Sequence, residues 1–293
     1  MSITVDCFGM TDRGKVRRLN EDQFLIADLA KSMKVMQSSL PDEHHQRKFG
    51  THHGKVFVVA DGMGGAAGGE VASGLAIETI TDYVLNTLPW FFRAQDGREK
   101  ELEDELKLAV EECQRKVATI AAGSRLHGMG TTLTMAYLLW PKLYVVHAGD
   151  SRCYLFRGGR AHRVTRDHTI AQQMIDRGVM GQEEAESSKW SNALWNCIGG
   201  GSDEITADVY RATLQPGDTV LLCSDGLSKY VEEAAIVKTL AVQPSAEAAC
   251  RSLIDDANTA GGSDNITVIV ARLVPVTNMS ETAVDSGMLL AAP

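Results

Sequence analysis

Five acidic sites in this 293-residue sequence lie beside glycine or asparagine at the ends of strand-like runs. The sites are Glu21-Asp22 after Asn20, Asp61 in Asp-Gly-Met-Gly-Gly, Asp150 in Ala-Gly-Asp-Ser-Arg, Asp225 in Ser-Asp-Gly and Asp264 in Gly-Ser-Asp-Asn. A glycine beside a carboxylate lets the backbone approach a bound ion closely and lets a main-chain carbonyl act as a ligand. The chemistry that these residue types favour is therefore the binding of hard cations.

Grouped carboxylates repel one another, so a folded site that gathers them is stable mainly when cations neutralise it. An all-oxygen ligand set favours Mg²⁺ or Mn²⁺ over zinc or copper. A single Asp-Gly or Asp-Asn pair is more typical of a simple turn. Five acidic sites at strand ends favour a metal centre, provided that the fold brings those ends together.

The elements that must position these carboxylates follow from the hydrophobic pattern. Strands are predicted at 23–27, 56–60, 131–139, 143–148, 152–157, 161–165, 219–223 and 266–270. Amphipathic helices are predicted at 69–88, 102–120 and 246–257, with a short helix at 170–177. Short connections between strands imply an antiparallel meander, and helices inserted in pairs imply an α+β layered domain in which sheets pack on each other beneath helices.

No internal break divides the chain, so we predict a single domain over residues 1–273. Within it, the polar segment 29–55 is expected to be a mobile insertion, and the glycine-rich segment 178–203 is expected to form a surface flap. Residues 274–293 are expected to be a loosely ordered tail.

The composition excludes several classes of protein. The net charge of −9 argues against nucleic-acid binding, which needs clustered Lys and Arg. The six cysteines show no CxxC pairing and are interpreted as reduced packing residues. No apolar run reaches the roughly 18–20 residues that span a bilayer, and the N-terminus lacks a leader pattern. We therefore expect a cytoplasmic monomer without membrane contact.

An ordered set of motifs resembles the bacterial form of the protein phosphatase 2C family. The matching motifs are 17–22 (Arg-Arg-Leu-Asn-Glu-Asp), 59–65 (Val-Ala-Asp-Gly-Met-Gly-Gly), 130–132 (Gly-Thr-Thr), 148–152 (Ala-Gly-Asp-Ser-Arg), 167–168 (Asp-His), 224–226 (Ser-Asp-Gly) and 264–267 (Asp-Asn-Ile-Thr). They cover roughly residues 3–273 in the family's order. The resemblance implies a β-sandwich of two mainly antiparallel sheets flanked by helices.

The resemblance also implies an activity, the removal of phosphate from phosphoserine and phosphothreonine in proteins modified by a serine/threonine kinase. It assigns Asp61 as the bridge between two Mn²⁺ or Mg²⁺ ions, with Glu21 acting through water and the Gly62 carbonyl on one side. Asp225 and Asp264 hold the other ion. Two ions about 3.5–4 Å apart can present a shared hydroxide to phosphorus, so no phosphoenzyme is needed.

The resemblance gives roles to three further residues. Asp150 helps bind a weaker third ion, and Asp22 lies behind the metal ligands. Arg17, four residues before Glu21, takes the position of the phosphate-binding arginine, since a guanidinium can clamp two phosphate oxygens. Arg18 is the alternative candidate for that clamp.

One departure from the family concerns the acid that protonates the leaving oxygen. Many eukaryotic members of the family carry His two residues after the bridging Asp, and many bacterial members carry it just after the Gly-Gly pair. This chain has Met63 and Ala66 at these two positions. A water on a third ion beside Asp150 is then the expected acid, because a bound cation lowers the pKa of its water. His168 is a candidate by residue type only, since Asp167-His168 is typically structural in this family.

Four other interpretations are weaker. Cys7-x₅-Arg13 has the spacing of cysteine-dependent phosphatases but lacks a glycine-rich phosphate loop, and residues 128–132 resemble a phosphate loop but lack its Gly-Lys-Ser/Thr ending. A non-catalytic binding module would be expected to have lost metal carboxylates that this chain keeps. A two-metal nuclease would need a basic stripe.

Overall fold

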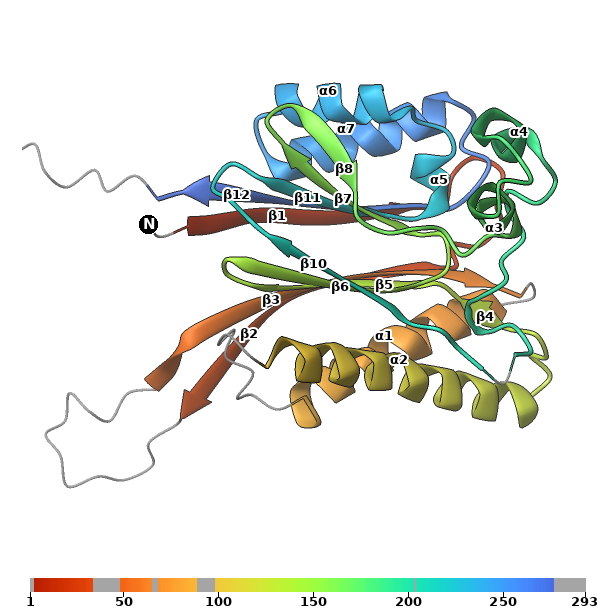
Figure 1. Cartoon of the computed structure of the whole chain (residues 1–293), viewed down its shortest axis with the longest axis horizontal. Coiled ribbons are helices and arrows are strands. Elements are labelled where there is room, and N and C mark those ends of the chain that lie inside the picture. Colours follow the sequence, from red (N-terminus) through yellow and green to blue (C-terminus); the bar gives the residue numbers. More distant parts are fainter. Residues whose placement is uncertain (1–2, 34–47, 65–67, 89–97, 203, 277–293) are drawn as a thin grey trace, which may run out of the picture.

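The computed structural model describes residues 3–33, 48–64, 68–88, 98–202 and 204–276. Two antiparallel sheets lie face to face (Figure 1). The first has the order β1 (Ile3–Asp12), β12 (Ile266–Pro275), β11 (Thr219–Cys223), β7 (Arg152–Arg157) and β8 (Arg160–Arg163). The second runs β10 (Asp208–Thr213), β6 (Lys142–Ala148), β5 (Leu133–Leu139), β3 (Lys48–Met63), β4 (Gly130–Thr131) and β9 (Ile198–Gly199), and β2 (Asp22–Met33) also pairs with β3.

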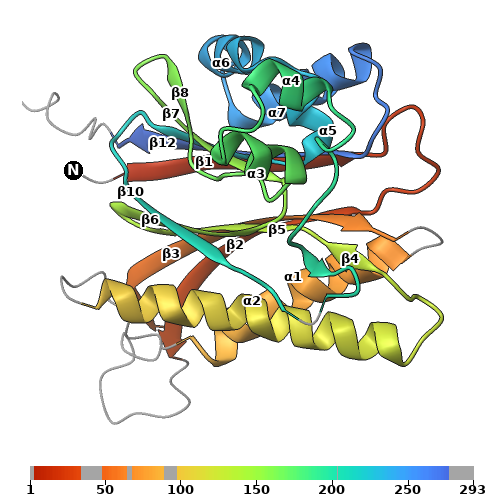
Figure 2. The same ribbon diagram turned by 45° about the vertical axis from the view of Figure 1, so that its right-hand side comes forward.

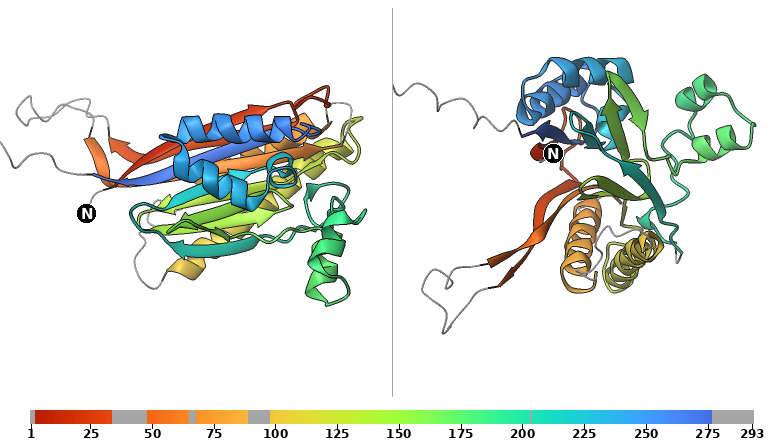
Figure 3. Two further views of the ribbon diagram at one scale, coloured as in Figure 1. Left: turned by 90° about the horizontal axis from the view of Figure 1, so that it is seen from above. Right: turned by 60° about the vertical axis from the view of Figure 1, so that its left-hand side comes forward.

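Helices cover the outer faces of both sheets. The second sheet carries α1 (Gly68–Asn86) and α2 (Glu99–Ala122), and the first carries α6 (Glu233–Val242) and α7 (Ala246–Thr259) (Figure 2). The one-turn helix α5 (Asp225–Ser228) follows β11 directly. Two short helices, α3 (Ile170–Asp176) and α4 (Gln182–Ser187), project from one end of the sandwich (Figure 3).

The core forms three layers because side chains alternate along each strand. On β12, Val268 and Val270 pack with the α7 side chains, whereas Ile269 packs between the sheets. On β3, Phe57 packs between the sheets and Val58 packs toward α1 and α2. The predicted α+β sandwich of two mainly antiparallel sheets flanked by helices is confirmed.

Several elements of the structure were not predicted from the sequence. The strands β1 and β10 and the helices α5 and α6 were not predicted. The two strands lie at sheet positions that depend on pairing with distant segments, β1 with β12 and β10 with β6. The segment 29–55 was expected to be a mobile insertion, and its described ends lie in strands, since β2 continues to Met33 and β3 begins at Lys48. Residues 34–47, in the middle of that insertion, lie outside the described part of the chain.

The other predicted segments have mixed outcomes. The flap at 178–203 contains α4 and β9 and is therefore partly regular. Most of the predicted tail, residues 277–293, lies outside the described residues. None of the helices in the described ranges is long and apolar enough to cross a membrane.

Candidate metal centre

Two acidic strand ends, on β2 and β3, meet the ends of β11 and β12 at one end of the sandwich. Asp22 on β2 lies directly opposite Asp61 on β3 in the antiparallel register. The buried Asp22 carboxylate accepts hydrogen bonds at Oδ2 from Ser224 Oγ at 2.8 Å and Thr267 Oγ1 at 2.7 Å. These hydroxyls come from the ends of β11 and β12, so Asp22 ties the two sheets together behind the other carboxylates.

The backbone of Asp61 is fixed by the Gly-Thr-Thr segment. Its N–H donates to Thr132 Oγ1 at 3.0 Å, and its carbonyl accepts from the Thr132 N–H at 2.9 Å and Thr131 Oγ1 at 3.0 Å. Thr132 is oriented in turn by Ser151, whose Oγ lies 2.7 Å from Thr132 Oγ1. With the backbone groups of Asp61 satisfied, its side chain remains as the group that can bind a ligand.

Glycines bring Glu21 against the backbone next to Asp61. A Cβ at Gly62 would lie 2.2 Å from the Gly69 carbonyl oxygen, and a Cβ at Gly69 would lie 2.7 Å from Glu21 Oε1. No side chain fits at either position. Ser73 Oγ also donates to the Glu21 carbonyl at 2.7 Å, so the Glu21 carboxylate and the Gly62 backbone are held side by side.

A second close approach places Asp225 beside Asp264. Asp225 is the first residue of α5, and Asp264 lies two residues before β12. A Cβ at Gly226 would lie only 1.9 Å from the Asn265 carbonyl oxygen, so only glycine allows this contact between the two segments.

Asn265 joins the loop that carries Arg17 and Glu21 to this centre. Its side-chain oxygen accepts from the Glu21 N–H at 2.9 Å, and its amide nitrogen donates to the carbonyls of Arg13 at 3.0 Å and Leu19 at 2.9 Å. This role of Asn265 was not predicted from the sequence. Its position directly after Asp264 was the available signal, since an amide side chain can satisfy loop backbone groups from both sides.

We predict that Asn265→Ala lowers both stability and activity. Three partly buried side-chain hydrogen bonds are lost and three loop backbone groups lose their partners, which should cost about 1–3 kcal/mol of unfolding free energy. Urea unfolding and steady-state kinetics measure the two effects. Asn258→Ala, which loses one bond to Asp12 from a half-buried site, is the matched control. Equal losses in the two variants would contradict the anchoring role.

The acidic cluster formed by Asp22, Asp61, Asp150, Asp225 and Asp264 carries excess negative charge. Burial raises the pKa of Asp61 well above its ordinary value, and repulsion from Asp22 and Asp225 adds to that effect. Burial likewise raises the pKa of Asp22 to about 7 and that of Asp150 to about 6. Asp22 Oδ1 and Asp225 Oδ1 are buried without a hydrogen-bond partner. Such carboxylates need a cation, so the residues present fit a metal centre.

Two basic side chains already contact this cluster. Arg17 Nη2 donates to Asp264 Oδ2 at 2.8 Å, with half of the Arg17 side chain exposed, and Asp264 raises the pKa of Arg17. Lys229 Nζ lies 2.5 Å from Asp225 Oδ2 and 3.2 Å from Asp150 Oδ2. Within the described ranges, no three His, Cys, Asp or Glu side chains are gathered as ready ligands around one point.

Of the two basic residues at this cluster, Arg17 was predicted from the sequence and Lys229 was not. Arg17 lies at the centre, whereas the alternative, Arg18, is simply exposed. Lys229 was not predicted. Its signal was the spacing of four residues after Asp225 at the start of a helix, which places the two side chains on one face.

His168 is a structural residue, as the family resemblance implied. Its buried ring accepts a hydrogen bond at Nδ1 from the Gly149 N–H at 3.2 Å and contacts Asn196 Nδ2 at 2.6 Å, while its Nε2 donates to Asp208 Oδ2 at 3.2 Å. Both ring nitrogens are therefore engaged. Met63 ends β3, and Ala66 lies outside the described residues.

The structure does not favour the other phosphate chemistries. Cys7 lies within β1 opposite Ala271, and burial raises the pKa of its thiol, so a reactive thiolate is disfavoured. Residues 128–132 contain β4 and lead into β5 and not into a helix, so they do not form a nucleotide-binding phosphate loop.

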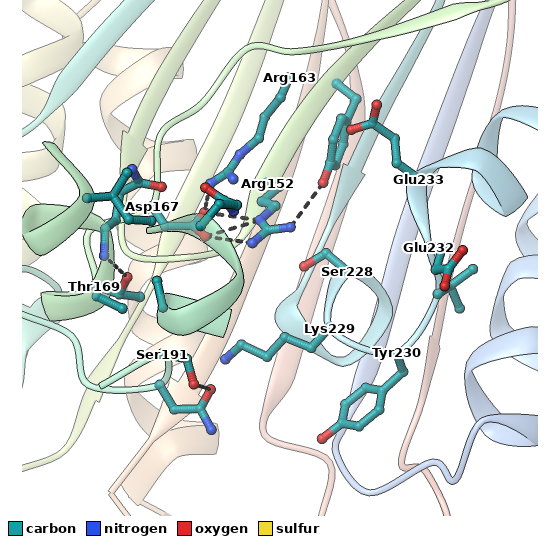
Figure 4. A pocket seen from close by; sticks show the side chains of 18 of the residues that line it. Arg152, Arg163, Asp167, Thr169, Ser191, Ser228, Lys229, Tyr230, Glu232 and Glu233 are labelled. Carbon is teal, nitrogen blue, oxygen red and sulfur yellow. Dashed lines mark hydrogen bonds and ion pairs between the residues drawn. The ribbon is translucent and has the colours of Figure 1, made fainter. Parts of the chain in front are cut away.

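A pocket of about 770 Å³ opens beside Lys229 (Figure 4). Arg152, Asp167 and Thr169 line one side, and Ser228, Lys229 and Tyr230 line another. Arg152 donates to both carboxylate oxygens of Asp167, which fixes that wall. The pocket has room for several amino-acid side chains.

Comparison with known proteins assigns the family. The sequence profile of protein phosphatase 2C matches residues 34–260. A serine/threonine phosphatase, stp, of Listeria innocua is 29% identical over 263 residues, covering 89% of this chain and 93% of that protein.

Solved structures agree with this assignment. The structure of the Mycobacterium tuberculosis serine/threonine phosphatase PstP/Ppp is 31% identical, with a TM-score of 0.71 over 94% of this chain and 100% of that one. The PstP catalytic domain in complex with two manganese ions has a TM-score of 0.69 at 31% identity, over 94% of this chain and 100% of that one. Because the family profile and the fold agree, this chain belongs to the protein phosphatase 2C family of phosphatases.

Proposed function

We propose that this protein hydrolyses phosphoserine and phosphothreonine in proteins at a centre of two Mn²⁺ or Mg²⁺ ions. The main support is the convergence of Asp22, Asp61, Asp225 and Asp264 at one end of the sandwich, with two buried carboxylate oxygens left without partners. The names of the similar phosphatases and the two manganese ions bound to PstP support the same conclusion.

The ligand assignment that we propose follows the placement of the acidic residues. Asp61 would bridge the two ions, with Glu21 and the Gly62 carbonyl on one side and Asp225 and Asp264 on the other. When bound, such an ion pair supplies an activated water as nucleophile and neutralises charge that develops on the phosphate. Asp22 would orient the ligands from behind through Ser224 and Thr267.

The chain's own cations would position the substrate. Arg17 extends over Asp264 with half of its side chain exposed, so its guanidinium can bind phosphate oxygens beside the metal ligands. The pocket beside Lys229 would receive the polypeptide that carries the phosphate. We propose that these substrates are products of a serine/threonine kinase and that the protein acts as a cytoplasmic monomer.

Phosphate release from a phosphothreonine peptide tests the proposal. We expect turnover with Mn²⁺ or Mg²⁺, loss of at least about 99% of it with a chelator, and recovery when metal is restored. A matched phosphotyrosine peptide is the control for substrate class. Turnover that persists in chelator and disappears in Cys7→Ser would instead support a thiolate mechanism, and metal binding without any phosphate release would support a binding module.

A further inference from the structure

The ammonium of Lys229 occupies a place where the family resemblance had implied another metal. Its Nζ lies 2.5 Å from Asp225 Oδ2 and 3.2 Å from Asp150 Oδ2, so one lysine bridges two carboxylates that are 75 residues apart in the chain. Asp150 is buried and Lys229 keeps only 23% of its side chain exposed. This is an enclosed ion-pair network and not a surface contact.

The backbone holds Lys229 in this place. Asp225 opens α5, and the Lys229 N–H donates to the Asp225 carbonyl at 3.0 Å at the end of that helical turn. The spacing of four residues puts both side chains on the same face. The ammonium therefore reaches Asp150 from a fixed point.

The two oxygens of Asp225 have different surroundings. Oδ2 contacts the Lys229 ammonium, whereas Oδ1 is buried without a hydrogen-bond partner. Only Oδ1 of Asp225 is left to bind one of the two ions of the proposed centre. A further divalent ion between Asp150 and Asp225 would have to displace the ammonium and leave it next to a like charge.

The charges of the site agree with this arrangement. The six carboxylates of the site are those of Glu21, Asp22, Asp61, Asp150, Asp225 and Asp264. When all are ionised, their six negative charges exceed the two positive charges of Arg17 and Lys229 by four. Two divalent ions supply four positive charges. A third divalent ion would give the site a net positive charge. With Lys229 in place, two divalent ions are enough to bring the net charge of these groups to zero.

We propose that Lys229 is a built-in cation that takes the place of a third metal ion between Asp150 and Asp225, so the centre binds two ions and not three. This inference rests on the proposed metal-dependent function. Asp150 then acts as a positioning residue that holds the ammonium, and a third ion and its water are not available as the acid for the leaving group.

The test is the number of Mn²⁺ ions bound at saturation, measured by electron paramagnetic resonance of free Mn²⁺ and by titration calorimetry. We expect two ions for the wild type and for Lys229→Arg, which keeps the charge. Lys229→Gln should bind three ions, because it frees both carboxylates. The double variant Lys229→Gln/Asp150→Asn should return to two. Lys238→Gln, on the exposed face of α6, is the control and should bind two.

Thermal melts with and without Mn²⁺ establish that each variant is folded, and Lys229→Met replaces Lys229→Gln if the latter is unfolded. Three ions in the wild type, or two ions in a folded Lys229→Gln or Lys229→Met protein, would overturn the inference while leaving the proposed function intact. A wild type that binds no Mn²⁺ and releases no phosphate would overturn the proposed function itself.

Discussion

Asp61→Asn should abolish phosphate release at saturating Mn²⁺. Asp61 is the carboxylate proposed to bridge both ions, and a neutral amide oxygen is a weaker ligand for a hard cation. Since the loss of a residue that merely supports a metal ligand costs about 10–100-fold, the loss of the bridge should lower kcat/KM by at least about a hundredfold. Initial rates on a phosphothreonine peptide measure the effect.

Stability gives an independent readout of the same substitution. In metal-free protein, Asp61→Asn should raise the melting temperature near neutral pH. The pKa of Asp61 is raised on folding, so the ionised carboxylate destabilises the folded state as pH rises above the ordinary value for Asp. With Mn²⁺ present the order should reverse, because the variant loses the stabilisation by bound metal.

Asp28→Asn is the matched control, since Asp28 lies on the same hairpin with a largely exposed side chain paired with Lys55. It should keep the wild-type rate and the wild-type response to Mn²⁺. Combining Asp225→Ala with Asp61→Asn should add little to the loss, because ligands of one centre act as a unit. Near-wild-type turnover of Asp61→Asn would remove Asp61 from the centre.

Arg17→Ala should raise KM for phosphopeptides about ten- to a hundredfold and change kcat less. A hydrogen bond to a charged group contributes about 1.5–3 kcal/mol, and this one would act on the phosphate of the bound substrate before reaction. Arg17→Lys should restore little, because an ammonium cannot contact two phosphate oxygens in the fixed geometry of a guanidinium.

Arg18→Ala is the neighbouring control, since Arg18 is exposed and one residue away. Both variants keep Asp264, which Arg17 contacts, so metal affinity should be measured alongside the kinetics. If Arg18→Ala raises KM and Arg17→Ala does not, the phosphate clamp is Arg18. A large fall in kcat for Arg17→Ala, with normal KM, would indicate a contact made only in the transition state.

The chemical character of the centre follows from local sequence features. Glycine or asparagine beside Asp61, Asp225 and Asp264 is a local feature, and so is the position of each near the end of an apolar run. The alternation of apolar residues along β3 and β12 likewise determines which side chains enter the core. These features could be read one segment at a time, which is why the fold class and the carboxylates were predicted together.

How these segments join depends on contacts between residues far apart in the chain. The bond from Asn265 to the Glu21 backbone spans 244 residues, and the contact of Lys229 with Asp150 spans 79. Such contacts depend on the order of β1, β12, β11 and β7 in the first sheet and on its packing against the second. Periodicity within a strand specifies which face is buried but not which strand lies beside it. The contact of Asp150 with Lys229 therefore depends on where the fold places the end of α5 relative to the turn between β6 and β7.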